Sequence, residues 1–450
     1  MDASTPSGYL RSVSKSYLVV IALVAGIAAT ETDVRAGGFG IPEIGVRRTA
    51  MGAVIGRPDD PSALYHNPAG LVLQDEWTIY ISAGLSLLST EFELAPWAES
   101  DRFLGASPDP QTGYYAPVKP SRAFGVIPML AVAGRLRPKL HVGAALFVGN
   151  GTGAAFDASA VTRYHLIDGY VIAPQAVIGG AYQVLPTLAL GATVGVINMR
   201  VHGRRDVYPV INGQDLSTLT GTKPELVLDG SGWAPSWTIA AFGRPHPRIT
   251  WGAALIGRVD ATLSGPITIT YSSDASTPND MLIGQQTTTQ LLPWTFQGGA
   301  NVDVTPNIEV GAELRYYLYR QYKHQHTDVV GIFLVRELDT EKNYHDSQEI
   351  TGGVRVHDLD AVPKLDVMLG GQYDRSPAPP SSLTLDSPSF SHFGFHSGLR
   401  YTIGNFRIGA SYIHYWYDVP TITDSITLPP SNIRGSGSNN IFTLSMEAHL

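Results

Sequence analysis

Polar and apolar residues alternate one by one along several stretches of the chain. The apolar face of the last stretch holds Phe442, Leu444, Met446, Ala448 and Leu450. Residues 308–318 repeat the pattern, with Glu309, Glu313 and Arg315 on the polar face. A period of two places the two sets on opposite faces of a β-strand. Because soluble β-sandwiches alternate in the same way, this pattern alone leaves the fold class open.

The complete pattern predicts an even number of strands, 14 by our count. The first seven lie near 77–94, 122–134, 139–150, 170–184, 187–202, 225–243 and 248–271. The other seven lie near 284–304, 307–322, 347–358, 363–375, 391–403, 406–418 and 439–450.

The connections between these strands alternate in length. The predicted tight turns are at Arg137-Pro138, Leu185-Pro186, His246-Pro247, Thr305-Pro306 and Gly404-Asn405. The predicted long polar connections are 95–121, 151–169, 203–224, 272–283, 323–346, 376–390 and 419–438. Short turns at one end and long loops at the other are typical of outer-membrane barrels. The pattern therefore predicts an all-β fold, a 14-stranded antiparallel transmembrane β-barrel over residues 77–450.

Composition and the N-terminus agree with a secreted barrel. The formal net charge of −8 argues against a nucleic-acid partner. Residues 1–36 are predicted to be a signal peptide, with cationic residues before an apolar run over 17–29 and a cleavage site near Ala36. A transmembrane anchor is the alternative, but that run is shorter than the roughly 20 residues that a helical span requires.

Residues 37–76 lie before the first strand and do not alternate. They are too few to form an independent core, whereas a barrel of this size is too wide for inward side chains alone to fill. We therefore expect this segment to fold into the lumen as a hatch. A disordered periplasmic tail is the alternative.

Several motifs resemble the FadL/TodX family of outer-membrane transporters of long-chain fatty acids and aromatic hydrocarbons. In the hatch they are Gly37-Gly38-Phe39-Gly40, Gly52-Ala53, Asp59-Asp60 and Asn67-Pro68-Ala69-Gly70, and further along the chain Tyr373-Asp374-Arg375-Ser376-Pro377. The resemblance covers the whole mature chain. It implies passive, diffusion-driven uptake of hydrophobic small molecules, with long-chain fatty acids as the expected ligands, hatch rearrangement, and lateral exit through a kinked third strand.

The resemblance also implies roles for particular residues. Phe39 matches an aromatic residue near the inner pocket, and Asn67 and Pro68 of the Asn67-Pro68-Ala69 motif match residues that abut the kinked strand. Gly149 and Gly151, at the end of the third strand, permit a bulge there, with a flexible extracellular loop as the equal alternative.

From the alternation itself, Arg258 and Arg315 fall on predicted inward positions and are candidates to bind a carboxylate head group. Ion pairing of these arginines with Glu309 or Glu313 is the alternative. We expect the outer surface to contact outer-membrane lipid and lipopolysaccharide.

The common catalytic signatures are missing from the sequence, so we expect no enzyme, no catalytic residue and no cofactor. An outer-membrane lipase is the competing enzyme class. His324, His326 and His345 lie in one predicted loop and offer metal ligands, but a solvated loop is the simpler interpretation and no metal site is expected. The other functional alternatives are an aromatic-hydrocarbon channel, a general porin and a surface receptor barrel.

Overall fold

The computed structural model describes residues 40–98, 100–121, 124–208, 210–211, 214–215, 224–271, 280–332, 335–386 and 388–450. The predicted signal peptide and Phe39 lie outside the described residues. From Gly40 to Leu450 the described residues form one compact unit. Among the described residues, no helix has both the length and the apolar character that a membrane span requires.

The barrel has 14 strands, as the alternation predicts. The first six are β1 (Thr78–Leu94), β2 (Phe124–Arg137), β3 (Leu140–Ala155), β4 (Asp168–Leu185), β5 (Leu188–Asp206) and β8 (Glu225–His246). The next four are each divided in two: β9 (Ile249–Ile256) with β10 (Val259–Tyr271), β11 (Asp280–Leu292) with β12 (Thr295–Thr305), β13 (Ile308–Tyr317) with β14 (His324–Val330), and β15 (Glu337–Glu341) with β16 (Ser347–Val356). The last four are β17 (Leu365–Asp374), β18 (Ser391–Ile403), β19 (Phe406–Asp418) and β20 (Ile433–His449).

The remaining elements are short. They are the hairpin β6 (Val210–Ile211) and β7 (Gln214–Asp215), and the helices α2 (Val46–Met51), α3 (Ala63–His66), η1 (Pro68–Leu73), α4 (Ser100–Leu104), η2 (Tyr319–Gln321) and η3 (Pro380–Ser382).

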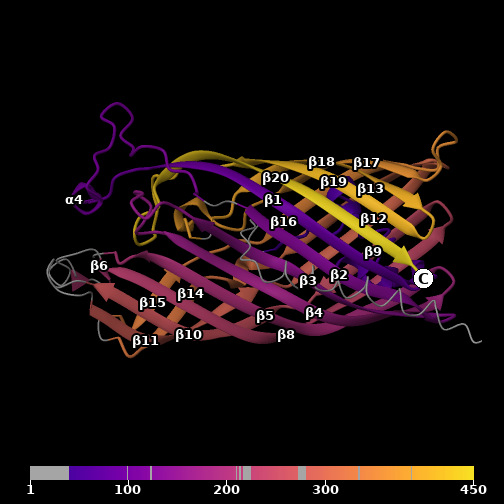
Figure 1. Ribbon diagram of the computed structural model, residues 1–450, viewed down its shortest axis with the longest axis horizontal. Helices are drawn as coiled ribbons and strands as arrows, with labels where there is room; N and C mark the ends of the chain where they lie inside the picture. The colour runs from indigo at the N-terminus through magenta and orange to yellow at the C-terminus, as the bar shows by residue number, and fades with distance from the viewer. Residues whose placement is uncertain are drawn as a thin grey trace, which may run out of the picture. The chain divides into compact units, whose positions relative to one another are not determined.

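The sheet closes on itself, because β1 pairs antiparallel with β2 on one side and with β20 on the other (Figure 1). Closure gives the strand backbones hydrogen-bonding partners without a free edge, which lipid requires because it offers no partner of its own. In β20 the large apolar side chains of Phe442, Leu444 and Met446 are exposed, whereas Thr443 and Glu447 are buried inside. The predicted alternation is therefore confirmed.

Five of the predicted long loops are shorter than expected, two of them because β5 continues to Asp206 and β11 begins at Asp280. β3 continues to Ala155, β20 begins at Ile433, and the predicted loop 323–346 contains β14 and β15. In β14 and β15 the exposed face is mostly polar, with His326 and Asp328 on one strand and Glu337 and Asp339 on the other. Because their outer face is polar, their sequences lack the polar and apolar alternation from which strands were predicted.

Residues 40–74 lie within the ring of strands and fill its periplasmic half. Gly45 approaches Tyr80 of β1, Gly56 approaches β12, and Ala69 approaches Gly191 of β5. A Cβ atom at Gly191 would lie 2.4 Å from the backbone nitrogen of Ala69, so only glycine fits there. The sheet thus uses inward-facing glycines to let the hatch backbone approach the wall.

Candidate functional site

A cavity of about 70 Å³ lies between the hatch and the barrel wall. Gly40 and Tyr65 line it from the hatch, and Gln297 and Arg315 line it from the wall beside them. Ile197, Val259 and Leu292 also line it, together with Gln175 and Ser236, which hydrogen-bond each other at 2.7 Å beside Ile197. The three apolar side chains belong to a cluster that continues through Met199, Leu263, Leu291 and the tyrosines 317, 319, 322 and 344. The cavity lining therefore contains a cation, neutral polar groups and part of an apolar cluster.

His66 of the hatch helps to hold the one cation of the cavity lining, Arg315. The ring Nε2 lies 2.8 Å from the carbonyl oxygen of Ile44 and so carries the proton, which leaves Nδ1 to accept a 3.1 Å hydrogen bond from Arg315. Burial, and then the charge of Arg315, hold the pKa of His66 well below its ordinary value. Protonation of Nδ1 would place an N–H group against a guanidinium.

The charge of Arg315 is balanced by a buried network. Its guanidinium lies 3.4 Å from Glu313 and 3.9 Å from Glu349. Arg48 of the hatch forms ion pairs with the same two carboxylates. Two cations and two anions thus share one water-excluded site, where removing any one group leaves a partner unpaired. Of the two partners predicted for Arg315, the structure shows Glu313; Glu349 was not predicted.

Arg258 does not point into the lumen, so that prediction is wrong. Its guanidinium lies 2.7 and 2.8 Å from the two carboxylate oxygens of Asp260 and donates to Gln321 on the outer side of the wall. The break between β9 and β10 inserts Gly257 and Arg258, after which the exposed positions are Asp260 and Thr262 and the buried one between them is apolar. The break shifts the alternation, and the sequence alone does not reveal it.

A second ion-pair network anchors the hatch near the periplasmic turns. Arg47 pairs with both Asp59 and Glu309, and Arg355 donates a 3.0 Å hydrogen bond to Glu309. Arg400 holds Asp59 with two hydrogen bonds of 2.9 Å. Burial alone would raise the pKa of Asp59, but the charges of Arg400 and Arg47 hold it well below its usual value. The anchor therefore stays charged over the physiological pH range.

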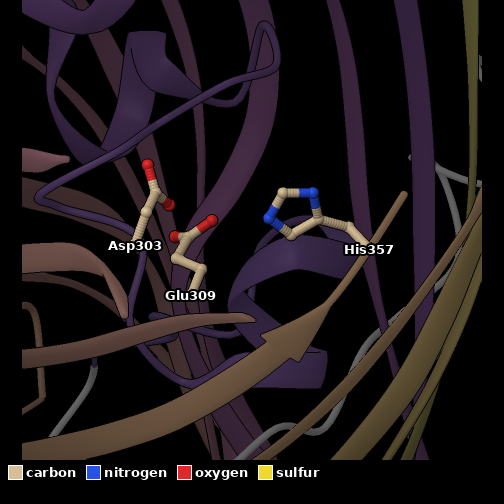
Figure 2. A group of neighbouring side chains, drawn as sticks. All are labelled: Asp303, Glu309 and His357. Atoms are coloured by element: carbon tan, nitrogen blue, oxygen red, sulfur yellow. The ribbon is translucent and has the colours of Figure 1, made fainter. Parts of the chain in front are cut away.

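Asp303, Glu309 and His357 lie close enough to suggest a metal site at this anchor, with ligand atoms within 4.8 Å of one another (Figure 2). However, Arg57 donates to both oxygens of Asp303, at 2.7 and 2.9 Å, and to Glu309 at 3.1 Å. Arg47 donates a hydrogen bond to the other carboxylate oxygen of Glu309. Because guanidiniums already occupy the lone pairs that a cation would need, the group is better explained as part of the anchor.

The three histidines considered as metal ligands do not form a cluster in the structure. His324 and His326 lie on β14, where His324 lies 3.8 Å from Asp339 and His326 lies 3.3 Å from Asp328. Both are about half exposed. This arrangement is that of a solvated strand extension.

The third strand contains a bulge at the predicted glycines. Its register with β4 shifts between Val148 and Gly151, and beyond Phe147 it has no ladder with β2. The hatch occupies part of the unpaired edge: Gly40 forms a bridge to Asn150, and Ile41 donates a 2.9 Å hydrogen bond to the carbonyl of Gly149. The glycines are therefore in a bulged strand, and the alternative of a flexible loop does not hold.

The Asn67-Pro68-Ala69 motif packs mainly against β5 and β8, away from the bulge of β3. Asn67 donates to the carbonyls of Ile55, at 3.0 Å, and of Ala241 in β8, at 3.1 Å, and accepts from the Ala69 nitrogen at 3.1 Å. The backbone of Pro68 and Ala69 lies against Gly191 of β5. The expectation that Asn67 and Pro68 abut the kinked strand is thus corrected, because the bulge is contacted by Gly40, Ile41 and Tyr65.

Comparison with known proteins identifies the family. A family model described as "Outer membrane protein transport protein (OMPP1/FadL/TodX)" matches residues 27–449. The chain belongs to this family. As a member of the FadL/TodX family, it is an outer-membrane barrel of a group that transports hydrophobic compounds. No curated protein matches the chain at a significant level.

Solved structures share the fold. A FadL homologue of Pseudomonas aeruginosa is 14% identical, with a TM-score of 0.71, 92% of this chain covered and 99% of that one. The toluene transporter TodX of Pseudomonas putida is 17% identical, with a TM-score of 0.67 and coverage of 93% and 99%. The toluene transporter TbuX of Ralstonia pickettii is 15% identical, with a TM-score of 0.65 and coverage of 92% and 99%.

Proposed function

We propose that this FadL/TodX family member takes up long-chain fatty acids passively across the outer membrane. The observation that carries the proposal is a cavity whose lining includes both Arg315 and side chains of an apolar cluster that extends beyond it. Burial of an alkyl chain releases about 0.8 kcal/mol per CH₂ group, so contact with the apolar cluster supplies most of the affinity.

The carboxylate of the ligand is received at Arg315. Because Glu313 and Glu349 already balance this guanidinium, the contribution of the contact is that of a charged hydrogen bond, about 1.5–3 kcal/mol. The chain of the ligand then lies toward Val259 and Leu292. The hatch residues Gly40 and Ile41 cover the unpaired edge of β3, and their displacement opens the lateral exit.

The competing substrate is a monoaromatic hydrocarbon, since similar solved structures include toluene transporters. A hydrocarbon has no head group for Arg315, so the two substrates differ in their dependence on that residue. The outward apolar belt contacts outer-membrane lipid, and the polar strand extensions meet lipopolysaccharide.

Uptake of labelled oleate and labelled toluene by cells stripped of their own fatty-acid transporter tests the proposal. We expect oleate uptake above background, reduced about tenfold by Arg315→Met and partly retained by Arg315→Lys. Arg135→Met, at an exposed periplasmic position, is the matched control. If the cells take up toluene but not oleate, and Arg315→Met does not change toluene uptake, the substrate is an aromatic hydrocarbon and not a fatty acid. Background uptake of both would refute the proposal.

A further inference from the structure

Besides the bulge of β3, the described barrel wall lacks a backbone ladder along a stretch between the eighth strand (β11 with β12) and the ninth (β13 with β14). β12 and β13 pair up to Thr295 and Tyr317, and β11 and β14 resume pairing at Thr288 and Thr327. The eighth-strand residues 289–294 lie between the two registers, within the fully described range 280–332. At roughly 3.3 Å per residue, this seam is about 20 Å long.

The local sequence explains why pairing stops here. Pro293 has no N–H group to donate to a ladder, and the ninth strand leaves the sheet as the helical turn η2. One backbone hydrogen bond, of 2.9 Å from Leu318 to the carbonyl of Trp294, closes the lower end of the seam.

Above that bond the hydrogen bonds across the seam involve side chains. At the upper end Thr288 donates a 3.0 Å hydrogen bond to the carbonyl of His326, and on the outer side Arg258 of the seventh strand donates to Gln321 of the ninth. Gln290 donates to the Tyr322 hydroxyl at 3.5 Å and accepts from Gln325 at 3.4 Å. Both distances lie at the upper limit for a hydrogen bond. The neighbouring break, between the ninth and tenth strands, is different, because backbone nitrogens of Lys342 and Asn343 bond the Lys323 carbonyl there, at 2.8 and 3.0 Å. The seam between the eighth and ninth strands is therefore the weaker of the two.

The lumen cavity reaches this seam. Leu292, Pro293 and Tyr319 line the cavity and flank the seam, whereas Asn150 lines the same cavity at the bulge of β3. The same cavity is lined by Ser236, Gly257 and Val259, at a break between the sixth and seventh strands, where pairing stops at Thr238 with Ile256 and resumes at Ser231 with Ser264. The cavity thus touches the wall at several places that lack strand pairing.

On the outside, the seam lies at the level of the membrane interface. The ring of Trp294 packs edge to face against Trp237, with 5.4 Å between centroids, and Trp233 is 70% exposed. The polar pair of Arg258 and Asp260 lies beside them. Tryptophans next to charged residues are typical of the boundary between lipid chains and head groups.

We propose that this seam is a second lateral portal, through which a single-chain amphiphile passes between the outer head-group region and the lumen cavity. The proposal rests on the proposed uptake function. Gln290, Tyr322 and Gln325 form the inner part of the closure, and Arg258 with Gln321 forms its outer part. The portal opens by breaking these side-chain contacts while the strand ladders on either side stay intact. An amphiphile suits such a route because its polar head starts among head groups and its chain enters an apolar cluster.

Cross-linking across the seam tests the portal, and the chain has no native cysteine to interfere. The variant Gln290→Cys with Gln325→Cys is treated with a bifunctional thiosulfonate, and oleate uptake is measured before cross-linking, after it, and after reduction. The control is Ser264→Cys with Thr287→Cys, which lie outside the seam and opposite each other in the intact ladder of β10 and β11. We expect cross-linking across the seam to lower oleate uptake at least fivefold, and reduction of the cross-link to restore it. In the control, cross-linking should change oleate uptake less than twofold.

A second variant tests the closure in the opposite direction. Gln290→Ala removes both hydrogen bonds of the Gln290 side chain, and we expect uptake to rise about twofold. If oleate uptake is unchanged by the seam cross-link, or falls equally in the control, the portal proposal is wrong. The proposed uptake function is then unaffected. Absence of oleate uptake by the unmodified protein overturns both.

Discussion

Gly252 of β9 is the position where one added methyl group should dislodge the hatch. A Cβ atom there would lie 2.0 Å from the carbonyl oxygen of Ile55 and 2.4 Å from the side-chain nitrogen of Asn67. Both are hatch atoms held in place, and Asn67 is fixed by its bonds to Ile55 and Ala241. The hatch must therefore move or the strand must bend.

The size of the effect follows from these contacts. Overpacking of this kind costs about 1–3 kcal/mol, and loss of the two Asn67 hydrogen bonds adds about 0.5–1.5 kcal/mol each. A total of about 2–6 kcal/mol corresponds to a population of undocked hatch at least thirtyfold larger. The barrel itself keeps its strand ladders, so the yield of heat-modifiable folded barrel should stay unchanged.

The assay is ion conductance in planar bilayers, together with protease cleavage within 40–74. Gly252→Ala should raise both. Gly298→Ala is the control on the next strand, because its Cβ atom would meet only a backbone oxygen at 3.6 Å. If the two variants conduct alike, the hatch does not pack against β9 as described.

Three further predictions concern the hatch and its anchor. Asn67→Ala and Pro68→Ala should reduce oleate uptake several-fold without lowering barrel yield, as quantitative blotting of folded protein would show; an equal loss of barrel would make the motif merely structural. Since the folded-state pKa of His66 is depressed, hatch docking should weaken as pH falls below the unfolded value of about 6.5, by up to about 1.4 kcal/mol per unit. Conductance should therefore rise between pH 7.5 and 5.5 in the native protein but stay flat in His66→Gln, and a parallel rise in both would contradict this role. Glu309→Gln should loosen the anchor and raise conductance at pH 7.5, whereas a level equal to the native one would mean that Arg47 and Arg57 hold the hatch without it.

The barrel architecture could be predicted from the sequence because contact with lipid requires an apolar outer face on every membrane-spanning strand. Alternation in 308–318 and 442–450 follows directly from having lipid on one face and the lumen on the other. The strand extensions over 324–341 were not predicted, because both of their faces can be polar. Water and polar head groups do not require one face of a strand to be apolar. The hatch was predicted from the opposite feature, a segment that lacks alternation and is too short to fold alone.

The site was predicted less completely. Arg315 was placed correctly because the alternation of β13 is regular, but the shift at Gly257 reversed the face of Arg258. The role of His66 depends on tertiary contacts with Ile44 and Arg315, which no local pattern encodes. Its position next to Asn67 in the hatch motif was the one available signal.

The measurement that bears most directly on the central claim is photo-cross-linking of a diazirine-bearing fatty acid to the purified native protein, followed by peptide mapping. If ligand occupies the cavity between hatch and wall, label should appear on Tyr65, Asn150 and Tyr319, and excess oleate should displace it. Label confined to the outer loops, or label on these residues that oleate does not displace, would contradict a ligand route through the lumen.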